Sequence, residues 1–184
     1  MALSLITAAA ALPVTLAQVR TYCRIEDARF DALLDDLRRA AVGMVEEYLG
    51  RSVGEQTWRL TLDAFADAIE LPRGPVLGLV ADSFKYVDIT GAPVVVPPEL
   101  YTLDTVTQPS WIVRNEGESW PETIDAVNVV QVDFTTGWTE TTMPAPLRTA
   151  VCMIAQAWFD GETGNLPPAA EVLLSPYRTL WIAA

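Results

Sequence analysis

A single apolar stripe between residues 30 and 48 constrains the fold more than any other feature of the sequence. Apolar side chains recur there at steps of three and four residues, which places them on one face of an α-helix. Asp27 and Asp31 lie near its expected start, where negative charge suits the helix dipole. Gly50 follows as a C-terminal stop. The stripe consists of Phe30, Leu33, Leu34, Leu37, Ala41, Met44, Val45 and Tyr48.

Two glutamates in the last turn of this helix oppose its dipole. Glu46 and Glu47 put negative charge where the dipole favours positive charge. Local propensity does not explain them, so two explanations stay open. One is an Arg on a neighbouring subunit, and the other is a solvated face.

A shorter helix is expected before the long one. Thr15 and Gln18 have the spacing of a capping box, and Val14 and Val19 have that of the matching hydrophobic staple. These signals predict a helix from about Thr15 to about Arg24.

Two more helices are expected after the middle of the chain. Pro146 suits the first turn of a helix. Its buried face is expected to consist of Leu147, Ala150, Val151, Ile154 and Trp158, and Gly161 and Gly164 end it. A last short helix is expected over Ala169–Leu174. Helices therefore occupy about 15–50 and 146–175, and residues 176–184 form a C-terminal tail.

The hydrophobic period changes from helical to strand-like between Gln56 and Gly137. Trp58, Leu60 and Leu62 alternate with polar residues, which is typical of a half-buried strand. Further strands are expected near Ile69–Leu71, Phe84–Ile89, Leu100–Leu103, Trp111–Val113 and Val129–Phe134. The fold class is therefore α+β: a helical core of about four helices, with a small antiparallel β-rich insertion (about 56–137) between the second and third. No repeat or linker divides residues 1–184, so a single domain is expected.

The charge balance argues against a protein that grips nucleic acid. The chain has 24 acidic and 12 basic residues and a formal net charge of −12. Lys85 is the single lysine. Binding to DNA phosphates requires clustered Lys and Arg, and no such cluster is present.

The sequence also contains few of the residues and motifs that enzymes use for catalysis. It contains no histidine, which removes the commonest general base and metal ligand. No phosphate loop, zinc spacing or nucleophile elbow is found, and no cofactor is expected. A pair of carboxylates is the one catalytic device left, and a solvated acidic surface explains the acids better.

The N-terminal residues Met1–Pro13 are apolar and rich in alanine. They resemble the apolar region of a signal peptide, but no basic residue precedes them. The apolar run is too short for a membrane helix, which needs about 20 residues. Cys23 and Cys152 are expected to be buried thiols in a reducing cytoplasm, although a disulfide between them stays open.

Tryptophans point to possible contact surfaces. Trp58, Trp111 and Trp158 fall on expected apolar faces and are interpreted as core residues. Trp120 and Trp138 lie in loops, as anchors or as interface residues. The segment Tyr177–Trp181 is too short to build its own core, so it docks either on its own subunit or on a partner.

A series of segments then resembles a known family. In order they are SLIT, PVTLAQVRTYCRI, VEEYLGRSV, QTWRLTLDAF, IELPRGPV, VVQVDFTTGW, PLRTAVCMIAQAWFDGETG and LPPAAEVLLSPYR. Together they resemble the head–tail connector (adaptor) family of long-tailed bacteriophages and of phage-like gene transfer agents. The resemblance covers nearly the whole chain. WFDGETG departs from it, because such proteins often have a more basic, Arg-containing turn there.

The resemblance implies a structural protein of the virion rather than an enzyme. It implies a ring, expected to be dodecameric, between the portal protein and the stopper or tail-terminator protein. DNA would pass through the channel without sequence-specific binding, and no membrane would be involved. The particle would assemble in the bacterial cytoplasm. The residues expected to contact the portal are Tyr177, Arg178, Leu180 and Trp181.

Other functions stay open at this point. The first is a stopper or tail-completion protein of the same particle, which would differ in the partner that it binds directly. The second is a secreted acidic binding module with a Cys23–Cys152 bridge. The third is a carboxylate-dependent hydrolase, which would need two clustered acids in a cleft.

Overall fold

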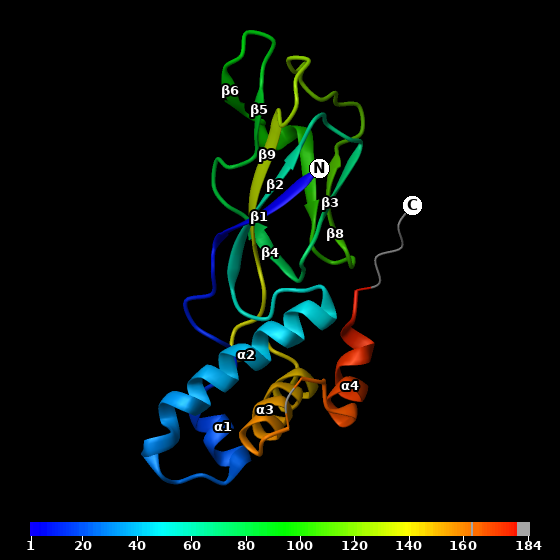
Figure 1. The fold of residues 1–184 in the computed structure, drawn as a ribbon. Helices are drawn as coiled ribbons and strands as arrows, with labels where there is room; N and C mark the ends of the chain where they lie inside the picture. Colours follow the sequence, from blue (N-terminus) through cyan, green and yellow to red (C-terminus); the bar gives the residue numbers. More distant parts are fainter. Residues whose placement is uncertain (163, 180–184) are drawn as a thin grey trace. The chain divides into compact units, whose positions relative to one another are not determined.

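The computed structural model describes residues 1–162 and 164–179, which divide into two compact units (Figure 1). Residues 1–10 and 55–137 form one, which we call the β-rich unit. Residues 11–54 and 138–184 belong to the other, which we call the helical unit. The α+β class is therefore confirmed. That both units act as a single domain stays a prediction.

The helical unit contains the four α-helices of the described residues. They are α1 (Leu16–Cys23), α2 (Asp31–Leu49), α3 (Ala145–Phe159) and α4 (Pro168–Leu174). Short 3-10 turns at Ala28–Phe30 and Ser175–Tyr177 precede α2 and follow α4. All four helices were predicted close to these bounds. None of the helices in the described part of the chain has the length and apolar character needed to cross a membrane.

The ends of α1 and α2 follow from particular side chains. The backbone N–H of Gln18 donates to Thr15 Oγ1 at 3.2 Å, and Thr15 N–H donates back to Gln18 Oε1 at 2.9 Å. The predicted capping box is therefore confirmed. At the end of α2, Gly50 adopts a left-handed φ of 67°, and its N–H donates to Glu46 O at 3.0 Å.

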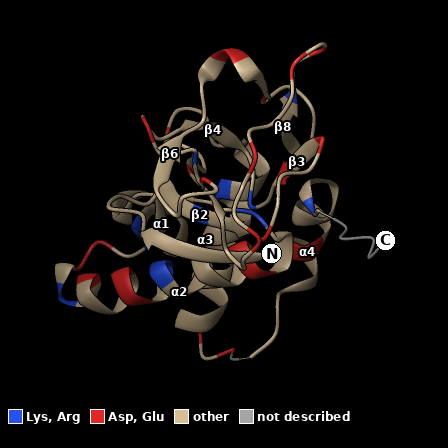
Figure 2. Ribbon diagram, turned by 90° about the horizontal axis from the view of Figure 1, so that it is seen from above, with Lys and Arg blue, Asp and Glu red and all other residues tan. Residues whose placement is uncertain are grey.

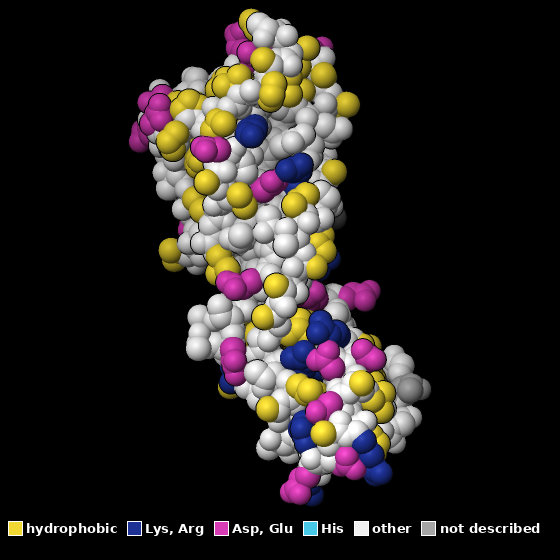
Figure 3. Space-filling model, turned by 90° about the vertical axis from the view of Figure 1, so that its left-hand side faces the viewer, with side chains coloured by type: hydrophobic (Ala, Val, Ile, Leu, Met, Phe, Trp, Pro, Cys, Tyr) yellow, Lys and Arg dark blue, Asp and Glu magenta, His cyan; other side chains and the backbone are white. Residues whose placement is uncertain are grey.

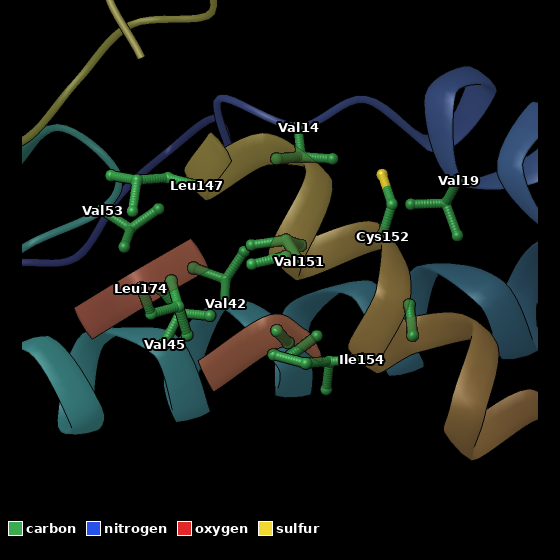
Figure 4. Close-up of a cluster of buried hydrophobic side chains, with 14 of the residues drawn as sticks. Val14, Val19, Val42, Val45, Val53, Leu147, Val151, Cys152, Ile154 and Leu174 are labelled. Carbon is green, nitrogen blue, oxygen red and sulfur yellow. The ribbon is translucent and has the colours of Figure 1, made fainter. Parts of the chain in front are cut away.

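The core of the helical unit is made from the inner faces of all four helices and the segments beside them (Figure 4). Leu34 and Val45 of α2 are fully buried, as the apolar stripe predicts. Leu33 differs, because 49% of its surface is exposed. It precedes Leu34 by one residue, a helical step of about 100°, and lies at the border of the buried face. Other fully buried members are Val14, Val19, Leu147, Val151, Ile154 and Leu174.

The β-rich unit contains two antiparallel sheets. The larger has the order β1-β2-β9-β5-β6, with β4 also paired to β9, and the smaller has the order β3-β8-β7. In the larger sheet the strands are β1 (Ala2–Thr7), β2 (Gln56–Leu62), β4 (Val76–Leu79), β5 (Lys85–Val87), β6 (Pro93–Val95) and β9 (Val130–Thr136). In the smaller they are β3 (Ala68–Leu71), β7 (Tyr101–Asp104) and β8 (Ser110–Arg114), with a 3-10 turn at Pro98–Leu100 before β7.

The predicted antiparallel insertion is thus confirmed, and three strands were not foreseen. These are β4, β6 and β1. β1 lies in the N-terminal segment that resembles a signal peptide. It pairs with β2 from Ala2 opposite Thr61 onward. The sheet therefore combines residues from before α1 with residues from between α2 and α3.

The core of the β-rich unit combines one strand pair with a group of aromatic rings. Leu60 of β2 lies opposite Val132 of β9, and both are fully buried. Trp120 stacks on Phe65, with ring centroids 4.7 Å apart, and donates its indole N–H to Ala66 O at 2.8 Å. Trp120 is therefore a loop anchor within its own unit, which is one of the two roles expected of it.

Candidate partner-binding site at the C-terminal segment

Two of the four candidate contact residues, Tyr177 and Arg178, lie in the described part of the C-terminal segment. Tyr177 is half-buried against the helical core, in the turn that follows α4. Arg178 is exposed, and its guanidinium lies over the Tyr48 ring, 5.1 Å from the centroid. Leu180 and Trp181 lie outside the described residues. The segment up to Thr179 is therefore docked on its own helical unit.

Thr179 ties the segment to the end of α2. Its backbone N–H donates to Leu49 O at 2.9 Å, which gives a partner to one of the carbonyls that a helix leaves free at its C-terminus. Its hydroxyl oxygen accepts from Arg51 Nε, also at 2.9 Å. The chain thus reaches Leu180 from a fixed point beside Leu49 and Arg51.

Arg51 places a cation close to the C-terminal end of α2. Burial lowers the pKa of its guanidinium from the ordinary value. An Arg remains charged in proteins even so, and positive charge there suits the helix dipole. Arg51 therefore contributes both a hydrogen bond and favourable electrostatics to the point where the C-terminal segment docks.

A hydrogen bond within the chain explains why Glu46 stands in the last turn of α2. Its Oε1 accepts a hydrogen bond from the backbone N–H of Val53 at 2.7 Å. Val53 is fully buried, so this carboxylate satisfies a donor in the loop that follows α2. Glu47 is exposed, which matches the solvated-face explanation.

Acidic charge is distributed unevenly between the two units. The β-rich unit carries 13 Asp and Glu against 4 Lys and Arg, a formal charge of −9. The helical unit carries 11 against 8, a formal charge of −3. Figure 3 shows the same difference on one face of the β-rich unit, where acidic side chains outnumber basic ones. On α2, by contrast, acidic and basic residues lie together (Figure 2).

Part of this charge is paired within each unit. Arg59 of β2 and Asp133 of β9 form a two-pronged pair, with both N–O distances at 2.7 Å. On α2, Asp35 accepts from Arg39 at 2.8 Å and also from Arg38. The hydrogen bond from Arg39 is the main reason that the pKa of Asp35 is lowered.

Catalysis by carboxylates would require two acids in one hollow and a raised pKa on one of them. The described residues contain no group of three His, Cys, Asp or Glu placed to hold a metal ion. A hollow of about 580 Å³ lies between α1 and α3, and no carboxylate lines it. A smaller hollow of about 300 Å³ has Asp160 and Glu162 in its lining. Asp88, after β5, and Asp104, the last residue of β7, have lowered pKa values, chiefly through hydrogen bonds from Thr90 and Thr107. A general acid would require a raised value.

Cys23 and Cys152 are free thiols in the structure, on α1 and α3. Burial, with a smaller contribution from Cys23, raises the pKa of Cys152 to about 11. Burial also raises the pKa of Cys23. Both thiols are therefore protonated near neutral pH, as expected of structural cysteines rather than nucleophiles.

Comparison with known proteins shows the fold. No protein-family model matches the chain, and no curated protein sequence matches it significantly. The solved structures that match all of the chain include three in which the match covers 98% of the neighbour. They are the neck of an empty gene transfer agent (GTA) particle computed with C6 symmetry (TM-score 0.81, 23% identity), the virion of a native GTA particle (0.79, 22%) and the neck of a native GTA particle computed with C12 symmetry (0.74, 24%). The chain therefore has the fold of a subunit found in these particles.

Proposed function

We propose that this protein is a structural subunit of the neck of a phage-like particle, and that it forms the adaptor ring between the portal and the stopper or tail. The observation that carries the proposal is the agreement of fold along the whole chain with subunits of GTA particles, at TM-scores of 0.74 to 0.81. The protein would act at the head–tail junction of a particle assembled in the bacterial cytoplasm.

Symmetry in the neighbours supports a ring of copies. Two of the three neighbouring structures are necks computed with C6 and C12 symmetry. A dodecameric ring is the form that we propose here. In such a ring each copy uses one surface to contact a different surface of the next copy.

The C-terminal segment is the proposed contact with the portal. Tyr177 and Arg178 dock on the helical unit, and Thr179 binds the end of α2. We assign Tyr177 and Arg178 mainly to holding the segment, and Leu180 and Trp181 to the portal surface. An apolar pair that follows a fixed point loses less conformational entropy on binding than the same pair on a free tail.

Two deletions test this assignment. Removing Leu180–Ala184 leaves the docked residues in place and is expected to abolish portal binding. Removing Pro176–Ala184 also takes away the anchor and is expected to do the same. Portal binding that survives the shorter deletion would contradict a role for Leu180 and Trp181.

The excess of acidic over basic residues supports a role next to DNA in which the protein does not bind the DNA tightly. Twelve copies at −12 each would carry about 144 negative charges. Like charge on a channel wall keeps the duplex from adhering as it slides. We propose that some of the acidic side chains of the β-rich unit line the channel. A neutral or basic channel wall in a reconstruction of the portal-bound ring would contradict this idea.

The direct test is a pull-down of the purified protein with portal assemblies from the same genome, imaged by negative-stain electron microscopy. A ring stacked under the portal is the expected result. If an intact portal binds nothing, the stopper or tail-completion function becomes the better proposal, because such a protein requires an adaptor already in place.

A further inference from the structure

Strand β1 is an edge strand whose side chains are mostly exposed. It pairs with β2 and forms one end of the strand order in its sheet. Five of its six residues are exposed, and Leu3 is half-buried. Leu5 and Ile6 are 46% and 48% exposed. Leu5 lies opposite Trp58 and Thr7 lies opposite Thr57, so Ile6 is the extra residue of a bulge. Exposed apolar surface is therefore present both on the regular part of β1, at Leu5, and at its bulge, at Ile6.

Other free edges of the two sheets carry features that discourage pairing with another chain. Proline, charge, bulges and short length are the usual protections of an edge. β6 contains Pro93, β3 contains Glu70, β7 contains Asp104, and β4 changes register between Val76 and Gly78. β1 is six residues long and has neither proline nor charge. It too has a bulge, between Leu5 and Thr7, but its register is regular over the four residues Ala2–Leu5 before the bulge. Its edge is therefore the one best suited to pairing.

The absence of charged side chains around β1 favours a second copy of this chain as the partner that covers its free edge. Residues 2–19 contain no charged side chain, whereas the whole chain carries −12. Two copies of such a chain repel each other wherever their acidic surfaces face. A contact through β1 avoids that repulsion and buries apolar surface at the same time.

We propose that β1 forms the contact between adjacent copies of this chain, with its free edge and exposed apolar side chains covered by a second copy. This inference names the surface through which adjacent copies of the proposed ring would meet. It rests on the proposed function in one respect, that the contact is head-to-tail. In a closed ring β1 meets a different element of the next copy. Pairing of β1 with another β1 would instead give a two-fold dimer.

A photo-cross-linking experiment tests the proposal. A benzophenone amino acid replaces Leu5 in the full chain, and the protein is irradiated both alone at high concentration and bound to portal assemblies. The control carries the same group at Ile89, which is 65% exposed in the turn between β5 and β6. We expect Leu5 to give a ladder of covalently linked copies. The attachment site, read by peptide mass spectrometry, is expected to lie outside β1.

Three results would overturn the proposal. They are no linkage between copies from Leu5 under either condition, linkage to β1 of another copy alone, and linkage to a different protein alone. As a second readout, Leu5→Lys is expected to abolish self-association while circular dichroism stays unchanged, and Ile89→Lys is expected to leave association intact. Self-association that Leu5→Lys leaves unchanged would also overturn it.

Failure of the β1 contact can be distinguished experimentally from failure of the proposed adaptor function. If portal binding is observed and Leu5 yields no linked copies, the inference fails while the adaptor function stands. If Leu5 yields the ladder and the portal is not bound, the contact between copies stands and the adaptor function fails.

Discussion

The guanidinium of Arg178 lies over the aromatic ring of Tyr48, 5.1 Å from its centroid. The two residues are far apart in the sequence, at the start of the C-terminal segment and in the last turn of α2. One residue further on, Thr179 binds Leu49 O through its backbone N–H. The last turn of α2 therefore holds the C-terminal segment by two adjacent contacts, and it determines where the final residues of the chain begin.

Replacing Arg178 by Met is expected to loosen this segment without unfolding the protein. An exposed cation–π contact contributes about 0.5–1 kcal/mol, so the melting temperature changes little. The amide of Thr179 is expected to exchange its hydrogen severalfold faster, because its bond to Leu49 O opens more often. Hydrogen-exchange mass spectrometry measures this directly.

Arg29 provides the matched control for that experiment. Its guanidinium lies over the Phe30 ring at 4.6 Å, at the start of α2. Arg29→Met removes the same kind of contact and is expected to leave exchange at Thr179 unchanged. An unaltered Thr179 amide in Arg178→Met would show that the cation–π contact does not hold the segment.

Glu46→Ala is expected to destabilise the protein, and Glu47→Ala is not. Removing the Glu46 carboxylate leaves the N–H of the buried Val53 without this acceptor, which costs about 1–3 kcal/mol. Glu47 is exposed in the same unfavourable last turn, so its removal is expected to change stability by less than about 0.5 kcal/mol. Urea unfolding of the two variants provides the comparison. Equal midpoints would contradict the role given to Glu46.

The helices were the most predictable part of the fold, because their signals are local. The capping box of Thr15 and Gln18 and the stop at Gly50 each depend on residues within one turn. The apolar stripe of α2 predicted Leu34, Ala41 and Val45 as core residues. It also included Leu33, since a stripe does not indicate how wide the covering helices are.

Strand pairing was beyond prediction, because the partners are distant in sequence. β2 pairs with β9, more than 60 residues away, and with β1 on its other side. Nothing in Ala2–Thr7 alone distinguishes an edge strand from the apolar region of a signal peptide. The distinction depends on the free edge of β2, which exists only once the sheet is formed.

The candidate site was predictable only in part. An apolar C-terminal segment indicates docking without naming the surface, and Arg178 docks on its own helical unit. The binding of Thr179 to Leu49 O was missed, because a backbone contact leaves no trace in residue type. One signal was available: a helix that ends at Gly50 leaves free carbonyls that need partners.

Leu174→Ala is expected to cost about 2–5 kcal/mol, because this side chain is fully buried in the helical core. Its loss would also loosen α4 and the segment that follows. Val172 on the same helix is 71% exposed, so Val172→Ala serves as the control and is expected to have little effect. Thermal unfolding of both variants checks the prediction. Similar melting temperatures would show that α4 does not pack as described.

Cys152 is expected to react slowly with iodoacetamide at neutral pH, because its pKa is raised to about 11 and only the thiolate reacts. The rate is expected to rise about tenfold per pH unit until the pH approaches that value. Mass spectrometry of the labelled peptides distinguishes Cys152 from Cys23. Labelling in denaturant is the control, since unfolding removes the burial that raises the pKa. Fast labelling of native Cys152 at neutral pH would contradict the packing of α1 on α3.

The same raised pKa predicts how stability depends on pH. The unfolded chain loses the Cys152 proton near pH 9, whereas the folded protein retains it until about pH 11. Above pH 9 the unfolded state therefore binds fewer protons than the folded state, and the free energy of unfolding falls as the pH rises. The contribution of Cys152 is fully present below pH 9 and is lost between pH 9 and about pH 11. Cys152→Ala is expected to flatten this part of the urea-unfolding profile, and an unchanged slope would mean that the thiol is ionised equally in both states.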